Sequence, residues 1–477
     1  MKLLDFLGYY SARASHQLSK RFSRRHLYTF FAVSTFFLMI TAQFFWATIH
    51  GDGAVYAWIT RQISEHGIIS GAPPHWTQTD IFAEHPYLFF YLSSGLTNLF
   101  GISDLVMKIP NFLVAGLSIW VVWRVACVRD GLQKKSYQIG LVAGYALILN
   151  AAYALQISQP TLDPLAQLFG YLPALILIYF NRSAFLAGFI LGLAFLTKGL
   201  ELLPNLAAVF FLICYLEYRN LKDLVRNVTF GLIGLAIPVA IWLGYDHFIW
   251  QGQWSQTYVM RQFQGRLLSE ANMKSFFGFA YLETFIRVYF IEIIIIAVGF
   301  FKSTMKCRRK DPLFFYFLCY LFFHLLAFMI IKKDSSQHLT GVILVGSVFV
   351  GESIWEGLQK LNRSLIRFLP AFLFVIALIY WCFYTFHKND KTDLWTSIKN
   401  ESENSDLNEN NLPIVVKDST ADNYGLFNTI QWYFPKHKVY LQPEADLLLI
   451  GQEVIMLSDR DGWKLVKERT TYKKGAL

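Results

Sequence analysis

Residues 184–217 read AFLAGFILGLAFLTKGLELLPNLAAVFFLICYLE. This stretch holds two apolar runs, 184–199 and 201–217, and Lys198 stands near the end of the first. Each run approaches the length of about 20 residues that a helix needs to cross the hydrocarbon core of a bilayer. Similar runs recur from Tyr28 to Tyr384. The pattern therefore predicts an all-α polytopic membrane protein.

The composition of the whole chain supports this class. Of the 477 residues, 55% are hydrophobic, 17% aromatic and 16% charged, and the mean hydropathy is +0.37. A soluble domain carries about 25% charged residues. The net charge of +10 does not indicate a nucleic-acid partner, because Lys and Arg gather in the N-terminal segment and in alternate short loops. That distribution follows the positive-inside rule and places basic side chains against membrane lipids.

The apolar runs predict eleven spans, with the N-terminus inside and the C-terminus outside. The expected spans are 27–48, 106–128, 137–156, 163–181, 184–199, 201–217, 226–248, 284–301, 313–331, 338–356 and 366–386. The first run is too long for the apolar part of a signal peptide and should stay as a span. Residues 1–26 are expected to form a basic surface helix.

Residues 86–101 decide the topology, because a crossing at this point would put the later basic clusters outside. The piece has only about 16 residues, short for a span, and we expect it to be a juxtamembrane element of the long outer loop 49–105. The transmembrane domain would then cover 1–390. An Asn-, Glu- and Ser-rich linker, 396–412, would open a small extracytoplasmic α/β domain at 396–477.

Within that C-terminal domain, strand-like segments are expected at 414–416, 438–442 and 446–457, and a helix at 424–434. A role in choosing the acceptor, in covering the site or in docking is open for it. The cysteines show neither a disulfide framework nor zinc spacing; they are Cys127, Cys214, Cys307, Cys319 and Cys382.

Ionisable residues gather at the outer ends of the expected spans. They are Asp52, Glu84, His85, Asp163, Lys198, Arg261, Arg266, Lys332, Lys333, Asp334 and His338. A transporter would instead place such groups near the bilayer midplane. Each also has a structural explanation: Lys332 and Lys333 would reach the interface by snorkelling, and Asp163 before Pro164 would cap a helix. The two arginines would be solvated loop charges.

Carboxylates beside several cations suit transfer from a phosphate-activated donor. A carboxylate can accept the proton of an attacking hydroxyl or amine. Lys and Arg can stabilise the charge that develops on a departing phosphate.

Several short motifs occur in the order found in the GT-C glycosyltransferases. Gly51-Asp52-Gly53-Ala54-Val55-Tyr56-Ala57, then Glu84-His85-Pro86-Tyr87-Leu88 and Lys108-Ile109-Pro110, resemble the first outer loop of that group. Leu196-Thr197-Lys198-Gly199 and the segment from Tyr258 to Arg266 resemble later motifs. The sequence is most similar in these places to aminoarabinose transferases and protein O-mannosyltransferases.

The resemblance implies a polyprenyl-phosphate sugar donor and an inverting transfer. We expect no cofactor, with the lipid-phosphate sugar as a substrate. It implies catalytic roles for Asp52 and Glu84, of which Asp52 would be the base or the group that orients the acceptor. Donor phosphate binding would fall to Lys198, Arg266, Arg261, His85, Lys332 and Lys333. Sugar or acceptor binding would fall to Asp163, Tyr56 and His338.

The chain also departs from the family pattern. Gly53 stands where a second acidic residue often follows the aspartate, which argues against a metal held by paired carboxylates. We therefore expect a metal-free glycosyltransferase of the inner membrane with an extracytoplasmic active site and a lipid or glycan acceptor. The alternatives are a protein O-mannosyltransferase-like enzyme, a transporter or flippase of lipid-linked sugars, and a scaffold without catalytic activity.

Overall fold

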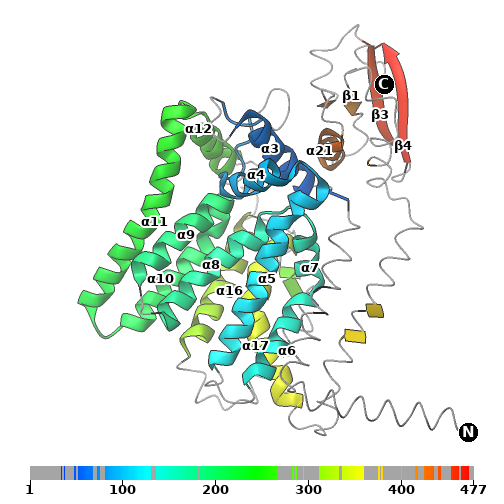
Figure 1. The fold of residues 1–477 in the computed structure, drawn as a ribbon. Helices are drawn as coiled ribbons and strands as arrows, with labels where there is room; N and C mark the ends of the chain where they lie inside the picture. Colours follow the sequence, from blue (N-terminus) through cyan, green and yellow to red (C-terminus); the bar gives the residue numbers. More distant parts are fainter. Residues whose placement is uncertain are drawn as a thin grey trace, which may run out of the picture.

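Apolar helices make up most of the described chain (Figure 1). The computed structural model describes residues 48–49, 52–67, 72–75, 81–129, 136–180, 183–265, 311–331, 336–358, 414–416, 424–433, 439–441, 453–460 and 464–471, with a few isolated positions elsewhere. The bundle consists of α5 (Asp104–Arg129), α6 (Ser136–Ile148), α7 (Ala151–Ser158), α8 (Asp163–Tyr179), α9 (Ala184–Lys198), α10 (Leu203–Glu217), α11 (Leu221–Ile249), α16 (Pro312–Ile331) and α17 (Thr340–Leu358).

Five helical stretches in the described residues are long and apolar enough to cross a membrane. They are Asp104–Arg129, Ala184–Glu217, Leu221–Ile249, Pro312–Ile331 and Thr340–Leu358. A sixth would be the bent pair formed by α6 and α7. The expected spans at 106–128, 226–248, 313–331 and 338–356 therefore match helices of the right length and composition. The total of eleven spans stays a prediction.

Two of these stretches are interrupted for identifiable reasons. Ala184–Glu217 contains α9, the 3-10 turn η1 (Gly199–Leu202) and α10. Gly199 has a φ of 66°, which a continuous right-handed helix does not contain, so the stretch divides where the sequence predicted two spans. Between α6 and α7 the axis bends by 72°, and the Asn150 side chain caps α7 by accepting bonds from the amides of Ala152 and Tyr153.

Glycines bring α9 and α11 into close backbone contact. A Cβ on Gly188 would lie 1.9 Å from the carbonyl oxygen of Gly231, and a Cβ on Gly234 would lie 2.1 Å from that of Phe185. Membrane helices associate through such small residues, because the surrounding lipid provides no hydrophobic drive for association. The α9–α11 pair lies next to the contact between α8 and α9, two helices that meet near Asp163 and Lys198.

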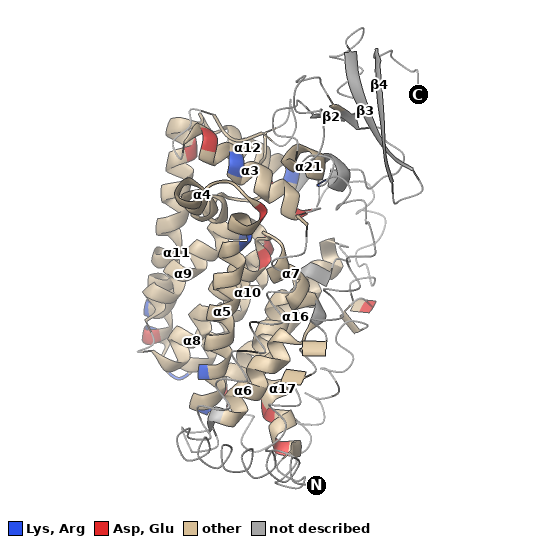
Figure 2. Cartoon of the chain, turned by 45° about the vertical axis from the view of Figure 1, so that its right-hand side comes forward, with Lys and Arg blue, Asp and Glu red and all other residues tan. Residues whose placement is uncertain are grey.

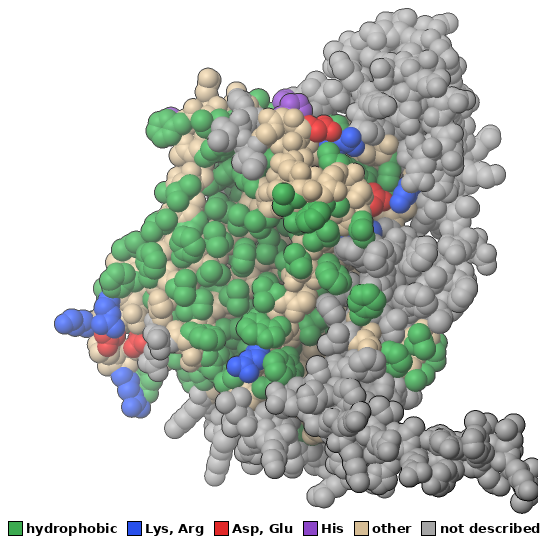
Figure 3. Space-filling view, viewed as in Figure 1, with side chains coloured by type: hydrophobic (Ala, Val, Ile, Leu, Met, Phe, Trp, Pro, Cys, Tyr) green, Lys and Arg blue, Asp and Glu red, His purple; other side chains and the backbone are tan. Residues whose placement is uncertain are grey.

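The surface of the bundle is apolar in its middle. Figure 3 shows hydrophobic side chains covering this part of the visible face, with charged groups toward the two ends. On α11 the exposed side chains include Phe230, Ile233, Ile237 and Ile241. In Figure 2 most charged residues of the described chain also lie toward the two ends. A bilayer accounts for this distribution, and the chain is an integral membrane protein.

Four short helices lie at one end of the bundle, which we call the α3 end (Figure 1). They are α3 (Asp52–His66), α4 (Leu88–Phe100), α12 (Gln253–Val259) and α21 (Tyr424–Tyr433). The π-helical turn η2 (Met260–Gly265) follows α12, and the 3-10 turn η3 (Ser336–Leu339) precedes α17. The apolar piece expected at 86–101 is thus α4, only 13 residues long.

The described residues near the C-terminus contain one sheet with the order β2-β1-β3-β4. Its strands are β1 (Ile414–Val416), β2 (Val439–Leu441), β3 (Glu453–Arg460) and β4 (Lys464–Thr471). β1 pairs in parallel with β2 and β3, and β3 pairs antiparallel with β4. The expected elements at 414–416, 424–434 and 438–442 are confirmed as β1, α21 and β2.

The strand expected at 446–457 matches only the start of β3, and β4 was not expected. The division into domains at 1–390 and 396–477 stays a prediction. The basic segment 1–26, the spans 27–48, 284–301 and 366–386, and the linker 396–412 lie almost entirely outside the described residues.

Candidate active site

Asp52 opens α3 at the α3 end of the bundle, and its side chain is exposed. The partial positive charge of the helix N-terminus favours a carboxylate at this position. Gly53 and Ala54 follow as buried residues of the same turn. The sequence therefore places one accessible carboxylate on an otherwise buried first turn.

Tyr56, one turn further along α3, lies amid the carboxylates of the site. Burial raises the pKa of its hydroxyl well above the usual value, and the negative charges of Asp52, Asp163, Glu84 and Glu201 raise it further. Its ring packs edge-on against that of His85, with 6.0 Å between the ring centroids. Four carboxylates from distant parts of the sequence thus act electrostatically on one tyrosine.

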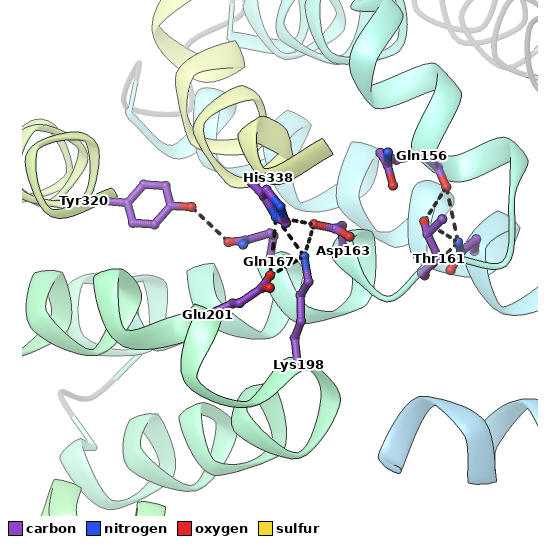
Figure 4. A network of polar contacts seen from close by, with 9 residues as sticks. Gln156, Thr161, Asp163, Gln167, Lys198, Glu201, Tyr320 and His338 are labelled. Carbon is purple, nitrogen blue, oxygen red and sulfur yellow. Dashed lines mark hydrogen bonds and ion pairs between the residues drawn. The ribbon is translucent and has the colours of Figure 1, made fainter. Parts of the chain in front are cut away.

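Lys198 is the centre of a buried ionic cluster shown in Figure 4. Its Nζ donates a short hydrogen bond to Asp163 Oδ1 and pairs with Glu201 Oε2 at 2.8 Å. His338 Nδ1 lies 3.2 Å from Lys198 Nζ and 3.3 Å from Glu201 Oε2. The side chain of Lys198 is only 3% exposed. Two carboxylates therefore balance this ammonium inside the protein.

The four residues of the cluster come from four different elements. Asp163 begins α8, Lys198 ends α9, Glu201 lies in η1 and His338 lies in η3. Behind it, the Tyr320 hydroxyl donates to Gln167 Oε1 at 3.0 Å, so α16 and α8 are linked next to the ionic groups (Figure 4). Sequence reasoning predicted Asp163, Lys198 and His338 but missed Glu201, whose position three residues after Lys198 was an available signal.

The loop that leads into Asp163 is held by Asn111 of α5. The Asn111 side-chain amide donates to the carbonyl oxygens of Gln159 at 2.5 Å and Thr161 at 3.0 Å. Both oxygens belong to the segment between α7 and α8. Asn111 is fully buried, so these bonds fix the start of α8 without exposing the loop to water.

At Gly199, the motif 196–199 contacts the motifs that contain Tyr258 and Pro86. A Cβ at this position would lie 2.1 Å from the Tyr258 hydroxyl and 3.3 Å from Pro86 Cδ. The Tyr258 hydroxyl accepts a bond from the Leu200 amide at 2.9 Å. A glycine is required here for two reasons, its positive φ and the close approach of the tyrosine. The turn after Lys198 therefore rests directly on the segment from Tyr258 and on the loop before α4.

The segment after Tyr258 also contacts the Glu84-His85-Pro86-Tyr87 loop. Gln262 Nε2 donates to the backbone oxygen of Glu84 at 3.0 Å. The charge of Arg261 lowers the pKa of Tyr87, although burial is the larger effect and leaves that pKa raised. Arg261 is half-buried and His85 is buried. Arg261 thus acts electrostatically on Tyr87, and the His85 ring lies against that of Tyr56.

The predicted residues fall into two groups. The structure brings Asp52, Tyr56, Glu84, His85, Asp163, Lys198, Arg261 and His338 to the α3 end. Arg266, Lys332 and Lys333 lie outside the described residues. The roles of all these residues stay predictions.

No His, Cys, Asp or Glu group in the described part of the chain has an arrangement suited to hold a metal ion. Asp163, Glu201 and His338 do converge, but on the ammonium of Lys198, which supplies the cation at their centre. A carboxylate at position 53 would also find no room, because a Cβ there would lie 2.8 Å from Gln159 Oε1. Metal independence stays a prediction.

Comparison with known proteins agrees with this architecture. The family model of dolichyl-phosphate-mannose-protein mannosyltransferases matches residues 84–242, about a third of the chain. That range runs from the Glu84 loop through the Asp163 and Lys198 helices into α11. No curated protein sequence matches the chain.

Among solved structures, ArnT from Cupriavidus metallidurans bound to undecaprenyl phosphate has a TM-score of 0.63 at 13% identity, with 92% of this chain and 97% of ArnT covered. Its apo state gives 0.61 at 13% identity, covering 91% and 93%. The oligosaccharyltransferase AglB from Archaeoglobus fulgidus, in complex with an inhibitory peptide and a dolichol-phosphate, gives 0.51 at 13% identity, covering 92% and 70%. The resemblance to the GT-C glycosyltransferases is confirmed, and the chain has the fold of ArnT.

Proposed function

We propose that this chain is a glycosyltransferase of the inner membrane that uses a polyprenyl-phosphate sugar. It transfers the sugar, with inversion, to an envelope lipid or glycan on the extracytoplasmic face. The contact of Gly53, next to Asp52, with the loop that leads to Asp163 carries the proposal, because it places an exposed carboxylate near the buried cluster of Asp163, Lys198 and Glu201 at one end of an apolar bundle. The fold of ArnT, whose structure holds undecaprenyl phosphate, supports the lipid-linked donor.

In the proposed reaction, Asp52 accepts the proton of the acceptor hydroxyl or amine. The acceptor oxygen or nitrogen then forms a bond to the anomeric carbon of the sugar. The bond from that carbon to the phosphate oxygen breaks on the opposite side, and the polyprenyl phosphate leaves with the bonding electrons. Asp52 suits this role because it is exposed on a buried helical turn, where an acceptor can reach it.

We assign binding of the departing phosphate first to Arg261 and His85, because Gln262, next to Arg261, bonds the backbone of Glu84 and His85 lies against Tyr56. Arg266, Lys332 and Lys333 join this assignment from the resemblance alone. For Lys198, two carboxylates already compete with any phosphate. We therefore propose that it acts mainly as a positioning residue for Asp163 and Glu201, and that Asp163, Tyr56 and His338 contact the sugar or acceptor.

Release of free polyprenyl phosphate from a panel of polyprenyl-phosphate sugars tests the proposal. Asp52→Asn should lower turnover by about 100- to 10,000-fold, the usual contribution of a general base, and should keep donor binding. Glu65→Gln is the matched control, since Glu65 lies on the same helix and pairs only with Arg61 among the contacts described for it. Equal turnover in wild type and Asp52→Asn would overturn the proposal.

Two other functions remain as outcomes of the same assay. A protein O-mannosyltransferase-like enzyme would release polyprenyl phosphate only when a hydroxyl-bearing peptide is added. A transporter or flippase would move the lipid-linked sugar across proteoliposomes without releasing the phosphate, and it would tolerate Asp52→Asn. The placement of the ionisable groups at one end of the bundle, and not at its middle, favours the enzyme.

A further inference from the structure

The C-terminal end of α21 packs against the first two turns of α3. Trp432 is buried in a small apolar cluster with Ile49, Ala54, Ala57 and Met107. Ala54 and Ala57 are three residues apart and so share a face of α3. Asp52 begins the same helix. The first turns of α3, which carry Asp52, therefore pack on one face against Trp432, a residue 380 positions after Asp52 in the sequence.

Asp104, the first residue of α5, gathers three donors from the C-terminal part of the chain. The Trp432 indole Nε1 donates to Oδ1 at 2.9 Å. The Tyr433 hydroxyl donates to Oδ2 at 2.9 Å, and Lys399 Nζ donates to the same oxygen at 3.1 Å. Bonds to a charged acceptor are stronger than neutral ones. The end of α21 is therefore held to the bundle by specific bonds in addition to its apolar contact.

The Tyr433 hydroxyl also reaches the chain just before α3. It accepts a bond from the Ile49 amide at 3.1 Å while it donates to Asp104. Ile49 is fully buried and precedes Asp52 by three residues. Further along α3, the Arg61 guanidinium lies 5.9 Å from the centroid of the Trp432 ring. α21 thus contacts α3 before its start, in its first turns and in its middle.

We propose that Trp432 and Tyr433 are positioning residues for the reaction centre, because they fix the N-terminal turn of α3 and with it Asp52. The proposal rests on the proposed function of Asp52 as the base. A displacement of about 1 Å in a reacting group can cost about 100-fold in rate. The C-terminal part of the chain would therefore act on turnover through Asp52, in addition to any role in acceptor choice.

The test uses the full-length protein in detergent with three conservative variants. Tyr433→Phe removes only the hydroxyl, and Trp432→Phe removes the indole N–H but keeps a ring. Trp355→Phe is the control: Trp355 is also buried, near the end of α17 that is far from His338. Each protein is assayed for turnover with donor and for amide hydrogen exchange in peptides covering 52–66.

Both Tyr433→Phe and Trp432→Phe should lower kcat by about 10- to 100-fold, leave the KM for the donor unchanged and speed exchange in 52–66. Trp355→Phe should change neither kcat nor that exchange. Wild-type kcat in both variants, or a lower kcat without faster exchange in 52–66, would overturn the proposal. If wild type released no polyprenyl phosphate, the proposed function would fail, whereas exchange, which needs no donor, would still decide whether α21 fixes α3.

Discussion

Gly53 lies against Gln159 so closely that a Cβ at position 53 would be 2.8 Å from Gln159 Oε1 and 3.1 Å from Pro160 Cδ. The Gln159 amide cannot move away freely, because its Nε2 donates to the backbone oxygen of Thr48 at 2.9 Å. The residue after Asp52 therefore touches the loop that leads to Asp163. In this chain a side chain at position 53 would require Gln159 or the first turn of α3 to shift.

Gly53→Ala should consequently displace the first turn of α3 and lower turnover by about tenfold or more, because small displacements of reacting groups are costly. Gly95→Ala is the matched control, since a Cβ on that helical glycine meets nothing within 4 Å. That change should raise stability slightly, by up to about 1 kcal/mol. Turnover and thermal unfolding of both variants check the prediction, and equal turnover would contradict it.

The loop before α5 could be predicted from the sequence in part. The run from Gly51 to Ala57 and the Glu84-His85-Pro86 motif predicted a carboxylate site at a membrane boundary, and Tyr56 now lies amid those carboxylates. The contact between Gly53 and Gln159 could not be predicted, because it joins residues 106 positions apart through a loop whose path depends on Asn111. Local pattern carries no information on such a path.

The ionic cluster around Lys198 was likewise predicted only in part. Lys198 at the end of an apolar run predicted a buried cation, but not that Asp163 and Glu201 would both pair with it. No role was predicted for Glu201. Its spacing from Lys198 was a signal for the pair, but its place beside Asp163 depends on the turn at Gly199, which puts η1 beside the start of α8. The contact of Trp432 with α3 could not be predicted from the spacing of apolar residues, because it joins segments that are distant in the sequence.

Lys198→Met should strongly destabilise the protein, because it leaves Asp163 and Glu201 buried without their cation. Breaking a buried pair in this way costs about 3–5 kcal/mol. The double change Lys198→Met with Asp163→Asn restores the original net charge of the cluster and should recover part of that loss. Thermal unfolding in detergent measures both, and a double variant no more stable than Lys198→Met would contradict the charge argument.

Gly199→Ala should be far more damaging than Gly67→Ala, although both glycines have positive φ values, 66° and 88°. Alanine at a backbone conformation of this kind costs about 1–3 kcal/mol, and Gly199, with a ψ of −138°, lies outside the left-handed helical region. At position 67 nothing lies within 4 Å of a Cβ, whereas at position 199 the Tyr258 hydroxyl would be 2.1 Å away. We expect Gly199→Ala to reduce donor turnover and Gly67→Ala to retain it; similar activities would show that the Tyr258 contact does not matter.

Arg129 offers a test of stability remote from the site, at the opposite end of α5. Its guanidinium pairs with Asp311 at 2.6 Å and with Glu352 at 2.5 Å, which ties α5 to α16 and α17. Arg129→Ala leaves two largely buried carboxylates without a cation and should cost about 3 kcal/mol or more. Arg124→Ala, on the same helix but exposed, should cost less than about 1 kcal/mol. Thermal unfolding compares the stabilities of the two variants. The KM for the donor should stay at the wild-type value in both, and a changed KM in Arg129→Ala would mean that this end of the bundle is energetically coupled to the α3 end.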